Sequence, residues 1–101
     1  MFSFFNRNSV KSVHISEINS LLPNIKLIDI REPYETSMGT VKGAIKIPMN
    51  TLLSNPEKYL KKDEEYYIMC QSGMRSMRAC KTLSALGYNV INVSGGYGGY
   101  R

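Results

Sequence analysis

The sequence predicts a small α/β domain in which a parallel sheet carries helices on both of its faces. Three observations support this fold class: the chain has 101 residues, its composition is that of a soluble protein, and strand patterns alternate with helix patterns. Strands that alternate with helices favour parallel pairing, because a crossover helix returns the chain to the same end of the sheet. Ligands of such sheets bind at the carboxyl ends of the strands.

Length and composition indicate one domain that spans residues 1–101, of which residues 1–8 are expected to form a flexible N-terminal extension. The chain is 43% hydrophobic and 21% charged, which is ordinary for a globular protein, and its length leaves room for one core. The apolar opening is too short for a signal peptide. No run approaches the roughly 20 apolar residues that span a bilayer. We therefore expect a cytoplasmic protein that does not bind membranes.

The net charge and the cysteine content limit the classes of partner and the cellular compartment that we expect. The net charge is +5, but the lysines are scattered along the chain and form no stripe, so nucleic-acid binding is not expected. The positive field favours small anions or acidic partners. Two cysteines in an otherwise cysteine-poor chain fit a reducing compartment. The sequence leaves the oligomeric state open.

The first half of the chain is expected to alternate short strands with short helices. An apolar-polar-apolar pattern predicts a strand at residues 13–15, after which Ser16 can cap a helix over residues 17–22. A β-rich segment over residues 25–30 predicts the second strand. Two further features follow, namely a helical turn that Pro33 opens and Gly39 closes, and a short strand that ends at Pro48.

The second half is expected to hold two strands and the longest helix. A compact β-prone run predicts a strand at residues 66–69, and a helical pattern over residues 76–86 ends at Gly87. Residues 88–93 form the last expected strand. The remaining expected features are a turn capped by Asn50, a short helix started by Pro56, a solvated charged turn at residues 61–65 and a glycine-rich loop at residues 94–101.

The strongest local signal is a cysteine between the strand at residues 66–69 and the following helix. Cys70 stands at the carboxyl end of the strand, where loop N–H groups and a helix N-terminus converge and lower a thiol pKa without a histidine base. Gly73 lets the loop curl. Arg75 adds a permanent positive charge suited to an anionic substrate. The alternative is an inert, buried Cys70, but a core cysteine does not require a glycine and an arginine in such a turn.

The other candidate side chains favour structural roles. Cys80 lies in the expected helix at a core-facing spacing with Ala79, Leu83 and Leu86, which favours packing over a resolving-thiol role. His14 has no cysteine or carboxylate near it in sequence, which favours a structural or surface histidine over a Cys-His dyad. No ligand spacing for zinc or an iron-sulfur cluster is present, and no P-loop signature either. We expect no metal and no cofactor.

Four segments match the pattern of one family in order. Residues 27–32 hold an Asp-x-Arg strand end, and residues 39–48 are similar to a Gly-His-Ile-x-Gly-Ala segment. Residues 70–76 fit an active loop, and Gly95-Gly96 with Tyr100 fits a closing Gly-Gly and aromatic pattern. Over nearly all of its length the chain therefore resembles a single-domain rhodanese, of the thiosulfate-type sulfurtransferase family. Thr40 and Tyr100 depart from the family, which often has histidine and tryptophan there.

The resemblance implies a set of roles. Cys70 is the expected persulfide-forming nucleophile, and the backbone from Gln71 to Ser76 is the expected cradle for its sulfur. Within this loop, Gln71, Ser72, Met74 and Ser76 shape and polarise the pocket, and Arg75 binds the anionic donor. Asp29 and Arg31 are expected supporting residues near the loop, with a structural ion pair as their favoured role.

The expected reaction is a double displacement. The Cys70 thiolate takes the outer sulfur of a small anionic donor such as thiosulfate, and a thiol, cyanide or protein acceptor then removes it. Two alternatives remain open. One is a cysteine-based phosphatase or arsenate reductase, although such loops have five residues between Cys and Arg, and only four stand between Cys70 and Arg75 here. The other is a non-enzymatic module that senses redox state or docks a partner through Cys70.

Overall fold

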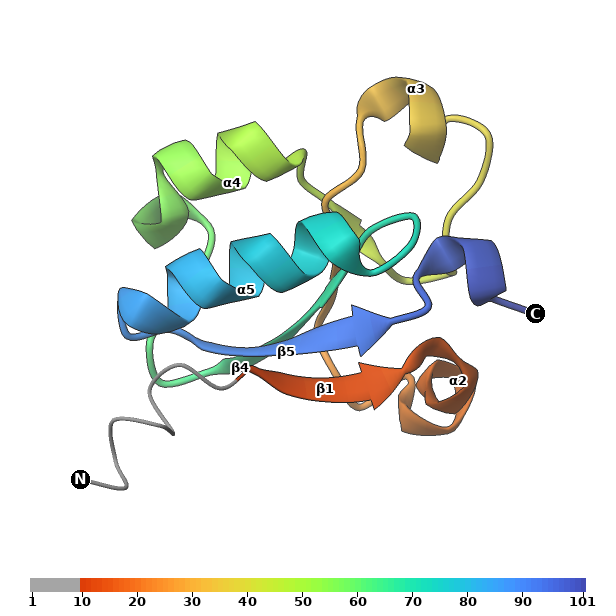
Figure 1. Cartoon of the computed structure of the whole chain (residues 1–101), viewed down its shortest axis with the longest axis horizontal. Coiled ribbons are helices and arrows are strands. Elements are labelled where there is room, and N and C mark those ends of the chain that lie inside the picture. The colour runs from red at the N-terminus through yellow and green to blue at the C-terminus, as the bar shows by residue number, and fades with distance from the viewer. Residues whose placement is uncertain (1–9) are drawn as a thin grey trace.

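The computed structural model describes residues 10–101, so the expected flexible extension at residues 1–8 lies outside the described residues. A five-stranded sheet, with every pair parallel, has the order β1-β5-β4-β2-β3 (Figure 1). Along the chain the strands are β1 (Lys11–His14), β2 (Leu27–Asp29), β3 (Ile45–Lys46), β4 (Glu65–Met69) and β5 (Asn89–Ser94).

Helices lie on both faces of this sheet, which confirms the predicted fold class. The longest helix, α5 (Met74–Ala85), and α4 (Met49–Ser54) pack together on one face (Figure 1). The opposite face is covered by the short elements η1 (Ile15–Glu17), α2 (Ile18–Leu21) and η3 (Tyr97–Gly99). Two other short helices, α3 (Pro33–Thr36) and η2 (Pro56–Lys58), lie in the connections.

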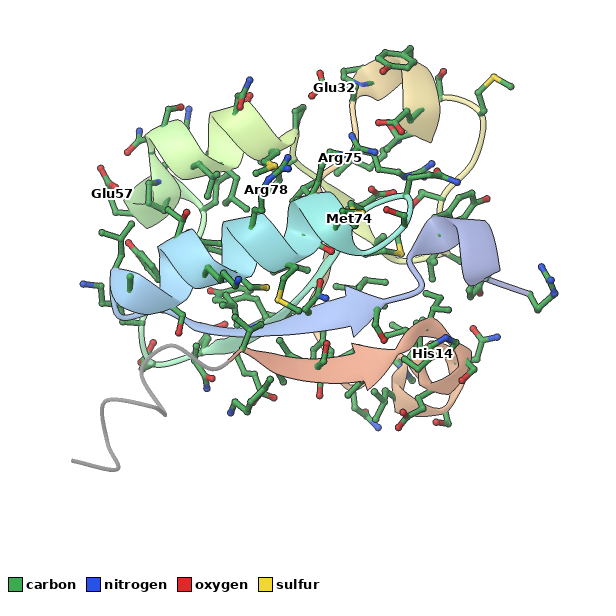
Figure 2. All side chains as sticks on the ribbon, viewed as in Figure 1. His14, Glu32, Glu57, Met74, Arg75 and Arg78 are labelled. Carbon is green, nitrogen blue, oxygen red and sulfur yellow. The ribbon has the colours of Figure 1, made fainter. Side chains whose placement is uncertain are left out.

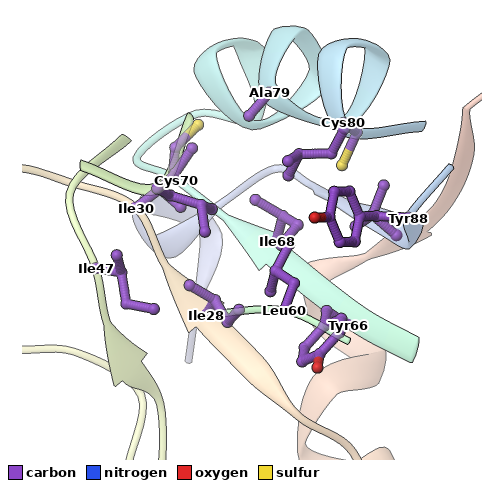
Figure 3. Packing of buried hydrophobic residues seen from close by; sticks show 13 residues of the cluster. Ile28, Ile30, Ile47, Leu60, Tyr66, Ile68, Cys70, Ala79, Cys80 and Tyr88 are labelled. Carbon is purple, nitrogen blue, oxygen red and sulfur yellow. The ribbon is translucent and has the colours of Figure 1, made fainter. Parts of the chain in front are cut away.

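The core is divided by the sheet into two clusters because successive strand residues point to opposite faces. In β4, Tyr66 and Ile68 pack on the side of α5, and Tyr67 and Met69 pack on the side of α2. Figure 3 shows the first of these clusters, in which Ile68 lies below the helix. Packing on both faces of the sheet therefore fixes the position of the carboxyl end of β4.

Several element boundaries differ from the sequence expectation. The long helix begins at Met74, two residues earlier than expected, because Gly73 adopts a φ of 102° and starts the helix. The expected N-cap roles are wrong at two positions. Ser16 lies within η1, and its N–H donates to the side chain of His14. Asn50 lies inside α4, which begins at Met49.

The carboxyl-terminal segments differ as well. The helical spacing predicts Leu86 on the core face of the helix, but Leu86 is the C-cap of α5 and is 50% exposed. The glycine-rich tail was expected as a loop, yet η3 forms within it and packs on η1. Among the described residues, no helix is long and apolar enough to cross a membrane.

Candidate active site at Cys70

Cys70 is the first residue after β4, and the end of the chain secures the loop that follows it. The backbone N–H of Tyr97 donates to the Cys70 carbonyl at 2.8 Å, and that of Gly98 donates to the Gln71 carbonyl at 2.9 Å. Gly96 makes this approach possible, because a Cβ there would lie 2.5 Å from the Cys70 carbonyl oxygen. The tail that follows β5 is therefore part of the site, a contribution that sequence reasoning missed.

The sulfur of Cys70 is surrounded by hydrogen-bond donors. It accepts the backbone N–H of Gly73 at 3.1 Å and that of Ser76 at 3.3 Å, and it lies 3.3 Å from the Ser76 hydroxyl oxygen. The Ser76 N–H belongs to the first turn of α5, where backbone N–H groups have no partner within the helix and the helix dipole is positive. The arrangement is suited to holding negative charge on sulfur.

Two opposing effects act on the thiol. Burial raises the pKa of Cys70, but hydrogen bonds from the Ser76 hydroxyl and from the N–H groups of Ser76, Gly73 and Ser72 outweigh it, so the pKa lies below the ordinary value. Cys70 itself is completely buried.

The side chain of Asn92 in β5 forms hydrogen bonds with the cysteine loop and with Ser76. The Ser76 hydroxyl oxygen lies 2.5 Å from Oδ1 of Asn92, and Nδ2 of Asn92 donates to the Gly73 carbonyl at 3.4 Å. Sequence reasoning missed Asn92, although a polar residue between Ile91 and Val93 in a buried strand was an available signal. Since the Ser76 hydroxyl has one proton, it donates to Asn92 or to the Cys70 thiolate, but not to both.

Arg75 pairs with Glu35 of α3, which sequence reasoning did not identify. The two terminal nitrogens of Arg75 donate to the two carboxylate oxygens of Glu35, both at 2.9 Å. The hydrogen bond from Arg75 is the largest effect on the carboxyl group and lowers the pKa of Glu35 to about 2. Figure 2 shows Arg75 at the start of α5, on the side of α3. Its anion-binding role stays a prediction.

Asp29 and Arg31 form a buried ion pair at the end of β2. Arg31 donates to Asp29 from Nε and from Nη2, the latter at 2.9 Å, and Thr40 donates to the same carboxylate at 2.6 Å. Arg31 also donates to the Gln71 side chain at 3.0 Å, and its guanidinium lies 4.2 Å from the centre of the Tyr97 ring. The pair therefore connects the sheet to the cysteine loop and the tail.

The remaining candidates lie apart from this hydrogen-bond network. Cys80 is buried in the core on the α5 side of the sheet (Figure 3), and burial raises the pKa of its thiol to about 12. His14 is exposed, and its ring bonds to Ser16. Within residues 10–101, no three His, Cys, Asp or Glu side chains come together in a group that could hold a metal ion.

An open groove of about 400 Å³ lies against the outer side of the loop. Met74, the first residue of α5, lines this groove and is 72% exposed, so its side chain faces solvent. Arg78 is exposed on the same helix one turn further (Figure 2). The full lining consists of Ser72, Gly73, Met74, Met77, Arg78, Asn92 and Ser94.

The fold and the site together define an α/β domain that places a hydrogen-bonded cysteine at the carboxyl end of a central parallel strand. Comparison with protein families then specifies the class, because residues 14–101 match the rhodanese-like domain. The chain belongs to the rhodanese-like family.

Known relatives agree with this assignment. A putative sulfurtransferase from Bacillus subtilis is 46% identical over 72 residues, which cover 69% of this chain and 67% of the relative. The human thiosulfate:glutathione sulfurtransferase is 31% identical and covers 85% of this chain and 89% of its own length. The crystal structure of a rhodanese-like domain protein from Staphylococcus aureus superposes with a TM-score of 0.83 at 34% identity, over 91% of this chain and 92% of the other.

Proposed function

We propose that this protein is a sulfurtransferase that carries a sulfane sulfur on Cys70 as a persulfide. The observation that carries the proposal is the set of polar groups around one sulfur atom: the N–H groups of Gly73 and Ser76 donate to it, and the hydroxyl oxygen of Ser76 lies 3.3 Å away. The similarity to sulfurtransferases of Bacillus subtilis and human origin supports the same reaction class.

The reaction is a double displacement at sulfur. The Cys70 thiolate attacks the outer sulfur of the donor, a new S–S bond forms, and the donor's own bond to that sulfur breaks with its electron pair on the leaving group. With thiosulfate the leaving group is sulfite, and with an organic persulfide it is a thiolate. An acceptor thiolate or cyanide then attacks the outer sulfur of the Cys70 persulfide and returns Cys70 to a thiolate.

The same donors serve both halves of the reaction. Negative charge resides on sulfur in the thiolate and in the persulfide, and preorganised N–H groups stabilise such charge without reorganisation during the reaction. No general acid is needed, because sulfite and thiolates leave as stable anions. The absence of a histidine from the hydrogen bonds of Cys70 is compatible with this chemistry.

The proposed partners follow from this chemistry. The donor is a small sulfane-sulfur compound, and the acceptor is a low-molecular-weight thiol, cyanide or the thiol of a protein. We place the reaction in the cytoplasm, since both cysteines are free thiols and such thiols persist in reducing compartments.

The alternative of phosphatase or arsenate chemistry has less support. An oxyanion enzyme directs the arginine of its loop to the tetrahedral substrate, whereas here Arg75 makes a bidentate pair with Glu35. The loop is also one residue shorter than in those enzymes, with four residues between Cys70 and Arg75.

Intact mass spectrometry tests the proposal. Wild-type protein, Cys70→Ser and Cys80→Ser are incubated with thiosulfate and with an organic persulfide, and cyanide is then added. We expect wild type and Cys80→Ser to gain the mass of one sulfur and to release it as thiocyanate, while Cys70→Ser does neither. A gain that needs Cys80 would refute the assigned nucleophile. No gain with either donor would favour the redox-sensing or oxyanion alternatives, which oxidants and phosphate esters then separate.

A further inference from the structure

The charges next to the cysteine loop compensate one another. Two arginines reach the loop: Arg75 is part of it, and Arg31 bonds to the side chain of Gln71. Each is paired with a carboxylate, Arg75 with Glu35 and Arg31 with Asp29. These four side chains therefore add no net charge to the loop, although the chain as a whole carries +5.

Glu35 is fixed in its position. The backbone N–H of Glu32 donates to Oε1 of Glu35 at 2.9 Å, and the same oxygen accepts from Arg75. The side chain of Glu35 is 17% exposed and that of Arg75 is 31% exposed, so water screens the pair only in part. With its pKa near 2, Glu35 keeps its negative charge at every pH at which a thiolate reaction runs.

Arg75 also lies next to the reacting sulfur along the chain, because it directly precedes Ser76, whose backbone N–H donates to the Cys70 sulfur at 3.3 Å. The hydrogen bonds that Arg75 donates to Glu35 raise the pKa of Arg75 most, burial opposes this rise, and the negative charges of Glu35 and of the Cys70 thiolate raise the pKa further. A donor that approaches Cys70 therefore meets the guanidinium of Arg75 together with the carboxylate of Glu35. An unpaired arginine would attract an anion, and this pair attracts it far less.

We propose that Glu35 sets the donor specificity of this protein by neutralising Arg75, so that the loop favours sulfane-sulfur donors with one negative charge or none, such as organic persulfides, over the thiosulfate dianion. This inference rests on the proposed sulfurtransferase function and specifies its donor. Glu35 acts through Arg75 and is a specificity-determining residue, not a catalytic one.

Two donors of similar size isolate the effect of charge. Thiosulfate carries two negative charges, and methanethiosulfonate carries one because a methyl group replaces one oxyanion. Both give the outer sulfur to the Cys70 thiolate, and the leaving groups are sulfite and methanesulfinate. The ratio of kcat/KM for thiosulfate to kcat/KM for methanethiosulfonate reports donor charge alone, since a general loss of loop structure affects both donors.

Four proteins form a charge series at this position. Relative to wild type, Glu35→Gln adds one positive charge, Arg75→Gln removes one, and the double variant restores the balance. We expect the ratio to rise roughly three- to tenfold in Glu35→Gln and to fall by a similar factor in Arg75→Gln at low ionic strength. The double variant should match wild type, and added salt should shrink the differences. Glu57→Gln changes the net charge equally, far from the loop (Figure 2), and should leave the ratio unchanged.

The outcomes are distinct. A ratio that follows the charge series supports the inference. Equal losses of kcat/KM with both donors, and hence a constant ratio, would mean that the Glu35–Arg75 pair only stabilises the loop. This result would overturn the inference. An equal response of Glu57→Gln would attribute the effect to net charge, and would overturn it as well. If wild type gains no sulfur from any donor in the mass measurement, the proposed function itself fails, and the failure is recognised before the ratio is measured.

Discussion

The Ser76 hydroxyl is predicted to determine a large part of the thiolate content of Cys70. In Ser76→Ala the thiolate loses the side-chain donor at 3.3 Å and keeps the N–H donors of Gly73 and Ser76. Burial raises the pKa of Cys70 and the hydrogen bonds lower it, so removal of one donor raises it. The thiolate fraction at a pH below the pKa falls accordingly.

The size of the effect follows from the value of one hydrogen bond to a charged group, about 1.5–3 kcal/mol. The lower end applies here, because the Ser76 hydroxyl must turn away from Asn92, at 2.5 Å, before it donates to the thiolate. About 1.4 kcal/mol corresponds to a factor of ten, so the thiolate fraction of Ser76→Ala is expected to fall about tenfold.

Alkylation by iodoacetamide as a function of pH measures this fraction. The second thiol does not interfere, since the pKa of Cys80 is about 12, and Cys70→Ser supplies the blank. The inflection of the alkylation rate against pH should lie at higher pH for Ser76→Ala than for wild type, and the two proteins should reach the same plateau rate. Ser72→Ala is the matched control, because the Ser72 side chain bonds to the N–H of Met74 and makes no bond to the sulfur. Superimposable profiles for wild type and Ser76→Ala would refute the assignment.

Two further predictions concern the ion pairs. Asp29→Ala leaves the guanidinium of Arg31 buried without its carboxylate, which should lower the free energy of unfolding by about 3–5 kcal/mol. Urea denaturation measures this loss, and Asp63→Ala, at an exposed position, is the control. A loss below about 1 kcal/mol would contradict the role of the pair. The folded-state pKa of Glu35, about 2, lies below the ordinary 4.5, so its contribution is fully present above about pH 4.5 and is lost as the pH falls toward 2. The stability difference between wild type and Glu35→Gln should shrink over this interval, and a difference that stays constant would exclude the ion pair as its source.

Features whose conformation depends on residues adjacent in the sequence could be predicted from the sequence. Alternating strand and helix patterns predicted a parallel α/β fold, and Cys70 before Gly73 predicted a cysteine between a strand and a helix. These signals are local, since a strand pattern, a glycine with positive φ and a proline at a helix start each depend on a few adjacent residues. The exact ends of the helices were less predictable, as the early start of α5 at Met74 illustrates.

Only the tertiary structure decided which distant side chains meet at the loop. Glu35 and Arg75 are 40 residues apart, Ser76 and Asn92 are 16 apart, and the tail reaches the Cys70 carbonyl from η3. Parallel strands bring their carboxyl ends to one edge, but the pairing of side chains there depends on strand order, register and loop path, which no local pattern encodes. For the same reason, the sequence by itself determined that this protein displays a cysteine on a loop, while the structure determined that the cysteine is buried and that the arginine beside it is neutralised.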